Sequence, residues 1–463
     1  MKRIKWTTYI GILFLILTSF GIFYPHTNCQ AKIPEVSAEA ACVMDVQSGA
    51  ILVDKNMKKK EYPASITKIM TTLVALENSS PEEMVTYDQT AFANWESGAS
   101  NIEIVDGEEM SMKESLYGIM LASANEACNG VANYIAGDID TYVGMMNARA
   151  ETMGCENTHF SNTNGLFNES HYTCPYDMAL IAREAMKNST FREIVGTKTY
   201  HMKKTNKRKK GYLLSNHHKM LNPVDMPKYG YEYCEGGKTG YTWRCKWTLV
   251  TYAKKDNMEL VCVTMRSDGP APLEPNCYTD TTKLLNYCFE KYQKQEIQTA
   301  GSAWKDYVFT RFSPLYDLDD PLISLEDGAG YILKKKDDPS QVQQEVSFYE
   351  TPIQKNGKMA IGKIVIKNQD QVVGGSEIFY NPTKKNPDQT IDLNVWYEEA
   401  NGAQKAPISW KKVVWILFLS VFGLAVLLLA FLRIRVVWIR NQRKRRYRSR
   451  ERQNRRYKDY WNS

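Results

Sequence analysis

Three short motifs in this chain combine residue types that can carry out acyl transfer. They are Ser65-Ile66-Thr67-Lys68, Ser123-Ala124-Asn125 and Lys238-Thr239-Gly240, in that order. A serine nucleophile needs a base, a proton relay and a positively charged side chain that binds an anionic group of the substrate. These parts come from distant segments of a fold. Each motif alone is weak, but the three in this order are typical of a serine acyl-transferase.

The surroundings of the first motif separate it from two other Ser-x-x-Lys sequences, at Ser302–Lys305 and Ser409–Lys412. Pro63 precedes Ser65, and apolar residues then recur at helical spacing, which predicts a helix with one buried face. Lys68 shares a face of the first turn with the serine. A lysine held beside a serine in a partly buried site loses affinity for its proton and can act as a base. The alternative is a helix cap with a solvated lysine, and the other two motifs argue against it.

The other two motifs lie where predicted elements meet. Ser123–Asn125 interrupts an apolar stretch before a second helical run, 126–135, so its polar side chains are expected to line a cleft. Lys238–Gly240 follows two glycines and predicts a strand beside two further strands, 248–253 and 260–265. Its glycine would allow close approach by a substrate, and its lysine would offer a fixed positive charge. The alternatives are a capping turn for the former motif and an edge strand with a surface lysine for the latter.

Around these motifs the chain resembles the low-molecular-weight penicillin-binding proteins, which are D-alanyl-D-alanine carboxypeptidases of the serine S11 type. The resemblance is carried by Tyr62–Thr71, Leu121–Ala127 and Gly236–Thr242, and by a predicted opening hairpin over 41–56. It extends from about residue 38 to 292 and continues weakly to about 383.

The resemblance implies a role for each matched position, with catalytic residues Ser65, Lys68, Ser123 and Asn125 and substrate-binding residues Lys238, Thr239, Gly240 and Tyr241. The first serine would be acylated and the first lysine would take its proton. The second motif would relay protons and orient the substrate amide. The third would bind the substrate's terminal carboxylate, helped by a further basic residue for which Arg244 and Arg266 are candidates. The backbone N–H groups of Ser65 and Tyr241 would form the oxyanion hole. No metal or organic cofactor is implied.

The implied activity is removal of the terminal D-alanine from peptidoglycan stem pentapeptides, with β-lactam antibiotics trapping the acyl-enzyme. A DD-endopeptidase, a β-lactamase and a catalytically silent penicillin-binding sensor remain as alternatives. A β-lactamase needs a carboxylate that activates the deacylating water, and no glutamate can be assigned to that task. The intact Ser65 and Lys68 argue against a silent sensor, because such a protein has no need of the pair.

The order of elements predicts an α+β fold. Strands, then a block of helices, then strands imply one antiparallel sheet flanked by helices, as in a β-lactamase or transpeptidase-like catalytic domain, here expected over 32–295. Turn signals at short spacing then predict a small β-rich domain over 296–383 and a spacer-like linker over 384–412.

Both ends of the chain carry membrane signals. Residues 1–31 are typical of a signal peptide, with an uncleaved anchor as the alternative. Residues 413–432 are uncharged and apolar and predict one C-terminal transmembrane helix. Thirteen basic residues against two acids give residues 433–463 a charge of +11, so this tail is expected in the cytoplasm, in contact with membrane lipids. The catalytic domain would then lie outside the cell membrane.

The charge of the remaining chain excludes one class of partner. The whole chain carries +7, of which the tail contributes +11 and the first five residues +3, which leaves −7 for residues 6–432. Nucleic acid is therefore not expected as a substrate of the catalytic domain.

The ten cysteines favour free thiols. Cleavage after Ala31 would leave nine, an odd number that forbids complete pairing within the chain. Two candidate disulfide pairs are Cys155 with Cys174 and Cys234 with Cys245. A domain of this size, however, does not need disulfide bonds for its stability.

Overall fold

The computed structural model describes residues 33–93, 96, 98–269, 274–297, 316–317, 320–321, 323–355 and 358–380. The predicted signal peptide, linker, membrane span and basic tail lie outside these ranges. Within them, no helix has the length and apolar character needed to cross a membrane.

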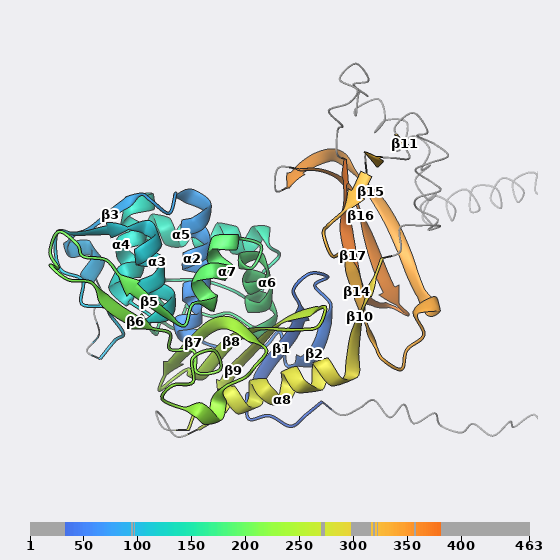
Figure 1. Cartoon of the computed structure of the whole chain (residues 1–463), viewed down its shortest axis with the longest axis horizontal. Helices are drawn as coiled ribbons and strands as arrows, with labels where there is room; N and C mark the ends of the chain where they lie inside the picture. The colour runs from blue at the N-terminus through green and yellow to red at the C-terminus, as the bar shows by residue number, and fades with distance from the viewer. Residues whose placement is uncertain are drawn as a thin grey trace, which may run out of the picture. The chain divides into compact units, whose positions relative to one another are not determined.

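The catalytic region is built on a five-stranded antiparallel sheet (Figure 1) in the order β2-β1-β9-β8-β7. The N-terminal hairpin thus pairs with the late strands, as the order of elements predicts. The register sets Cys42 opposite Val263 and Lys238 opposite Val250. The strands are β1 (Ala40–Asp45), β2 (Ile51–Lys55), β7 (Cys234–Thr242), β8 (Lys246–Lys255) and β9 (Met258–Ser267).

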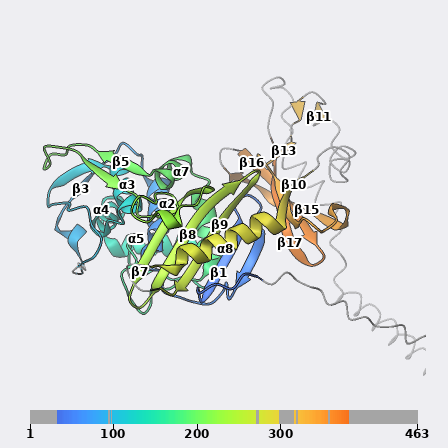
Figure 2. The same ribbon diagram turned by 60° about the horizontal axis from the view of Figure 1, so that its bottom comes forward.

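Helices cover both faces of this sheet, which explains why its central strands are buried along most of their length. A hydrophobic core lies on each side of the sheet, and alternate residues of β9 pack into the two cores. Val261 and Val263 pack into one core, and Leu260 and Cys262 pack into the other. Helix α8 (Asn276–Lys291) lies across the latter face (Figure 2). The opposite side carries α2 (Lys68–Asn78), α3 (Met112–Leu121), α4 (Asn125–Ala136), α5 (Ile139–Thr152), α6 (Pro175–Ala185) and α7 (Ser189–Gly196).

Local sequence signals set several helix ends. The side chains of Ser111 and Asp138 accept hydrogen bonds from the first turns of α3 and α5, and Pro175 starts α6. Gly137 ends α4 with a left-handed φ of 84°. Two small antiparallel pairs flank the helices, β3 (Met84–Tyr87) with β4 (Glu108–Ser111) and β5 (Thr199–Met202) with β6 (Tyr212–Ser215).

Most predicted elements appear with shifted ends. The helical run expected over 126–135 is α4, and the strands expected over 248–253 and 260–265 are β8 and β9. The first motif differs in kind. Ser65 lies in a 3-10 turn, η1 (Ala64–Thr67), and the α-helix begins only at Lys68.

A second sheet follows α8 in the sequence. Its order is β10-β14-β17-β16-β15, and β13 also pairs with β17. The strands are β10 (Tyr292–Glu296), β13 (Ile323–Leu325), β14 (Gly330–Lys334), β15 (Val342–Lys355), β16 (Lys358–Asn368) and β17 (Gln371–Tyr380). The assignment of residues 296–383 to a separate small β-rich domain stays a prediction.

The cysteines within the described ranges are free thiols. Most are buried, and burial raises the pKa of thiols such as Cys128 and Cys262, so they behave as small apolar side chains of the core. This agrees with the favoured expectation of unpaired cysteines.

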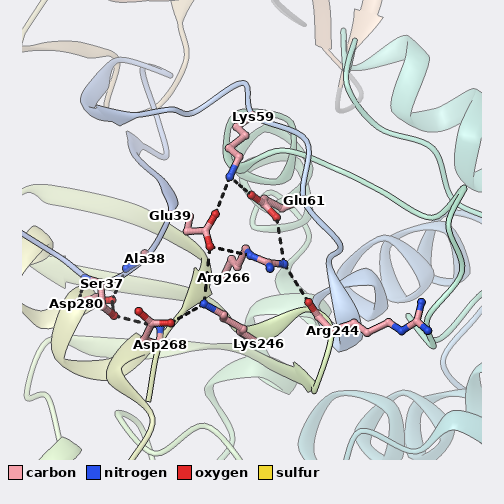
Figure 3. A network of polar contacts seen from close by, with 10 residues as sticks. All are labelled: Ser37, Ala38, Glu39, Lys59, Glu61, Arg244, Lys246, Arg266, Asp268 and Asp280. Atoms are coloured by element: carbon pink, nitrogen blue, oxygen red, sulfur yellow. Dashed lines mark hydrogen bonds and ion pairs between the residues drawn. The ribbon is translucent and has the colours of Figure 1, made fainter. Parts of the chain in front are cut away.

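Asp280 fastens the start of the described chain to helix α8 (Figure 3). Its buried carboxylate accepts hydrogen bonds from Ser37 N at 2.9 Å, Ser37 Oγ at 2.7 Å and Ala38 N at 2.9 Å. Three bonds to one buried carboxylate make this contact worth more than a surface pair.

We therefore expect Asp280→Asn to lower the free energy of unfolding by about 2–3 kcal/mol in a urea titration, because hydrogen bonds to a buried charged group are lost. Asp268→Asn is the matched control. Asp268 binds Lys246 at 2.6 Å at the surface, where an ion pair contributes at most about 1 kcal/mol. Equal losses in the two variants would contradict the account.

Candidate active site

The turn that carries Ser65 has a strained backbone held by its neighbours. Ala64 has φ +52°, a left-handed conformation that is unfavourable for alanine. The Thr67 Oγ1 hydroxyl donates to Ala64 O at 2.9 Å, and Gly165 lies against the same carbonyl. A Cβ at position 165 would be 1.9 Å from Ala64 O, so only glycine fits there.

Lys68 is fully buried and lies beside the serine. Its Nζ is 3.0 Å from Ser65 Oγ, 2.7 Å from Asn125 Oδ1 and 2.6 Å from the backbone carbonyl oxygen of Asn164. Burial lowers the pKa of Lys68 to about 8, and the nearby Cys128 and Glu126 offset this only partly. A neutral amine has two N–H groups and one lone pair. The two short contacts can take both N–H groups, which leaves the lone pair for the Ser65 hydroxyl proton.

The second motif turns the chain between two helices. Helix α3 ends at Leu121 and α4 begins at Asn125. Between them, Ser123 takes a left-handed φ of +61° and is buried. The Asn125 N–H donates to Ser100 O at 3.0 Å, which fixes the start of α4 and with it the amide that binds Lys68.

The third motif lies on β7, the strand at one edge of the sheet. At Gly240, an added Cβ would be 2.9 Å from Ser65 N and 2.4 Å from Thr248 Oγ1, so the strand backbone packs directly on the serine turn. Thr248 Oγ1 also donates to Pro63 O at 2.8 Å. Thr239 is half-buried, and Tyr241 is exposed with its ring 4.5 Å from that of Trp247.

Lys238 is the second buried lysine of the site. Its Nζ donates to Thr239 O at 2.9 Å. Burial, reinforced by the positive charge of Lys68, holds the pKa of Lys238 well below its usual range. An anionic ligand beside Lys238 would favour its charged form.

The two candidate arginines differ in their surroundings. Arg266 donates to Glu39 Oε1 at 2.8 Å and to the Arg244 carbonyl oxygen at 3.0 Å, within a network that includes Lys59 and Glu61 (Figure 3). The Arg244 side chain points away from that network. Its guanidinium lies 4.3 Å from the Phe167 ring centroid and 4.7 Å from that of Trp243.

Sequence reasoning missed several contributors. Asn164 supplies a backbone oxygen, which no side-chain motif can reveal, although Asn164-Gly165 is a recognisable turn signal. The loop is anchored where Thr71 Oγ1 donates to Thr163 O at 2.5 Å. His171 was also missed, since it stands alone in the sequence. Among the residues that the structure describes, no group of three or more His, Cys, Asp or Glu side chains could hold a metal ion.

A serine beside a buried lysine, next to an edge strand that carries a second buried lysine, defines a serine acyl-transferase on a transpeptidase-like scaffold. The chain belongs to the S11 peptidase family of D-alanyl-D-alanine carboxypeptidases, whose model matches residues 27–269, more than half of the sequence.

Individual relatives agree with this membership. The chain is 29% identical over 387 residues to D-alanyl-D-alanine carboxypeptidase DacF of Bacillus subtilis, covering 82% of this chain and 93% of that protein. It is also 29% identical over 273 residues to DacA of Escherichia coli K12, and the match covers 57% of this chain and 64% of that protein. The crystal structure of the Streptomyces K15 DD-transpeptidase is 29% identical with a TM-score of 0.50, covering 56% and 99%. The D-alanyl-D-alanine carboxypeptidase of Mycobacterium tuberculosis H37Rv is 27% identical with a TM-score of 0.50, covering 56% and 93%.

The contact of Gly240 with the serine turn yields a prediction. Gly240→Ala should slow acylation by benzylpenicillin by about 100-fold, because a shift of about 1 Å at the nucleophile is enough for such a loss. Stopped-flow kinetics of the purified protein measures it. Gly144→Ala, in helix α5 with no neighbouring atom within 4 Å of the added Cβ, should acylate at the wild-type rate. Wild-type acylation by Gly240→Ala would contradict the geometry.

Proposed function

We propose that this protein is a serine-type D-alanyl-D-alanine carboxypeptidase that removes the terminal D-alanine from peptidoglycan stem pentapeptides through an acyl-enzyme on Ser65. The observation that carries the proposal is the position of Lys68 Nζ, 3.0 Å from Ser65 Oγ and bound to two further oxygens. The family membership of residues 27–269 supports the same reaction.

In the acylation step, neutral Lys68 takes the proton of Ser65 as Oγ attacks the carbonyl carbon of the penultimate D-alanine. The scissile C–N bond then breaks, the ester on Oγ forms, and the departing amine of the terminal D-alanine receives a proton. Ser123 and Asn125 are assigned to relaying that proton and orienting the substrate amide. The left-handed turn at Ser123 and the bond from Lys68 to Asn125 support this assignment.

The oxyanion that develops in this step needs fixed donors. The backbone N–H groups of Ser65 and Tyr241 are assigned to it. The packing of Gly240 against the Ser65 amide supports this, since it brings the two segments together. The edge position of β7 also leaves backbone groups with which an extended peptide can pair.

The terminal carboxylate of the substrate is assigned to Lys238 and Thr239. Burial and the charge of Lys68 both disfavour a charged Lys238 in the empty site, and a carboxylate would restore that charge. Because two charged lysines would repel each other, the bound carboxylate favours the state in which Lys238 is charged and Lys68 is neutral. Of the two arginines, Arg244 is the better candidate for a further contact, because Arg266 is bound to Glu39.

Water completes the reaction by hydrolysing the ester on Ser65. A β-lactam would acylate the same oxygen and act as an inhibitor wherever hydrolysis of that ester is slow. An amine in place of water gives transpeptidation, and a cross-linked substrate gives endopeptidase action; both use the same acyl-enzyme. The Streptomyces K15 structure is that of a DD-transpeptidase. Experiment must therefore decide whether water or an amine accepts the acyl group from Ser65.

We expect Ser65→Ala to abolish D-alanine release from a stem pentapeptide and covalent labelling by fluorescent penicillin, while circular dichroism stays unchanged. The assay uses the full chain in detergent. Ser302→Ala, which alters another Ser-x-x-Lys sequence, is the control and should keep both activities. Labelling that persists in Ser65→Ala would refute the nucleophile. Labelling of the wild type without D-alanine release would point to a cross-linked substrate or to a penicillin sensor.

We further propose that residues 1–31 direct export and that residues 413–432 anchor the protein in the cell membrane. The catalytic domain at 32–295 then lies outside, and the basic tail at 433–463 lies in the cytoplasm against anionic lipids. The β-rich segment over 296–383 and the linker over 384–412 would hold the catalytic domain away from the membrane. The apolar run and the arginine-rich end of the sequence support this arrangement.

Protease treatment of intact cells tests the topology. The catalytic region should be digested while an epitope tag after Ser463 stays protected, and deletion of residues 413–463 should release the enzyme from the membrane. Digestion of the tag would contradict the orientation. A deleted chain that stays bound would point to an uncleaved N-terminal anchor instead.

A further inference from the structure

The strained carbonyl of Ala64 is held by Thr67, and Thr67 is in turn held by a histidine from a distant loop. His171 Nε2 lies 2.8 Å from Thr67 Oγ1, and the Thr67 hydroxyl donates to Ala64 O. His171 precedes α6 in sequence by only a few residues and is buried, with its ring 5.6 Å from that of Phe160. It reaches the nucleophile's turn from about one hundred residues away in sequence.

The hydrogen bonds fix which nitrogen of His171 carries the proton. The backbone N–H of Ser161 donates to His171 Nδ1 at 3.0 Å, so Nδ1 is an acceptor. Burial lowers the pKa of His171 to about 3, with smaller contributions from His159 and Lys68, so the ring is neutral at physiological pH. The single proton of the ring is therefore on Nε2 and is donated to Thr67 Oγ1.

A directed chain of three hydrogen bonds results. It runs from the Ser161 N–H to Nδ1, from Nε2–H to Thr67 Oγ1, and from the Thr67 hydroxyl to Ala64 O. Because Nε2–H occupies one lone pair of the Thr67 oxygen, the hydroxyl proton is left pointing at Ala64. The left-handed Ala64, with φ +52°, directly precedes Ser65. The direction of this carbonyl thus sets the position of Oγ relative to Lys68.

We infer that His171 is a positioning residue for the nucleophile, acting through Thr67 on the Ala64–Ser65 turn. The inference rests on the proposed role of Ser65. Among the described residues, His171 makes no hydrogen bond to the Ser65 side chain or to Lys68, so its effect is on the rate of acylation rather than on substrate binding.

Two amide variants separate the two nitrogens of the ring. Asparagine can place an acceptor near Nδ1 for Ser161 but has no donor that reaches Thr67. Glutamine can place a donor near Nε2 for Thr67 but leaves the Ser161 N–H without its acceptor. Each variant keeps one hydrogen bond and loses the other, so their losses of stability should be similar, and their melting temperatures should fall by similar amounts.

The measurement is the maximal acylation rate with benzylpenicillin, together with kcat and KM for D-alanine release, on the full chain in detergent. His171→Asn should lower the acylation rate and kcat by about 10- to 100-fold with KM changed less than about threefold. His171→Gln should stay within about threefold of the wild type. Thr67→Val should reproduce the loss of His171→Asn, and the double variant should lose no more than either single one, because the effects share one path.

Equal acylation rates in His171→Asn and His171→Gln would overturn the inference. It would also be overturned if the loss of acylation rate followed the fall in melting temperature and not the loss of the donor to Thr67. Additive losses in the double variant would overturn it as well. The acylation rate tests the positioning role, whereas D-alanine release in the wild type tests the proposed activity. A wild type that is acylated without releasing D-alanine would contradict the carboxypeptidase assignment alone.

Discussion

The burial of Lys68 is the constraint on which the rest of the site depends. A charged ammonium at this position would be removed from water and surrounded by neutral oxygens, which cannot replace a full counter-charge. Burial therefore lowers the pKa of the lysine to about 8, which raises the fraction of neutral amine near neutral pH. The two N–H groups are taken by Asn125 and Asn164, so the lone pair can face Ser65. The geometry of the site follows from the need to hold those two acceptors in place.

The scaffold meets this need by bringing several segments against one turn. The loop at Gly165 and the edge strand at Gly240 both approach so closely that a side chain would collide with the turn. A left-handed residue such as Ala64 costs about 1–3 kcal/mol, which the surrounding contacts offset. Hydrogen bonds from Thr67 and Thr248 to the carbonyls of successive residues hold the strained backbone. The turn is thus defined by tertiary contacts more than by its own sequence.

This dependence explains what the sequence could predict. Strands β8 and β9 and helix α4 were expected from apolar periodicity, and the three motifs from residue types at fixed spacing. The 3-10 geometry at Ser65 could not be predicted from the local sequence. Gly165 and Gly240, which impose this geometry, are far away along the chain. The Asn164 oxygen belongs to the backbone, and any residue there could supply it. His171 carries no local signal, since its partners Ser161 and Thr67 meet it only in the folded chain.

The most direct test of the account is the titration of Lys68 itself, followed by NMR of the full chain carrying labelled lysine side chains. Lys68→Met identifies the signal by its loss. The account predicts that Lys68 loses its proton as the pH rises through about 8, so that the neutral, base-competent form dominates above that value. A Lys68 signal that titrates near the ordinary lysine value of about 10.4 would contradict the central claim that burial makes this lysine the base for Ser65.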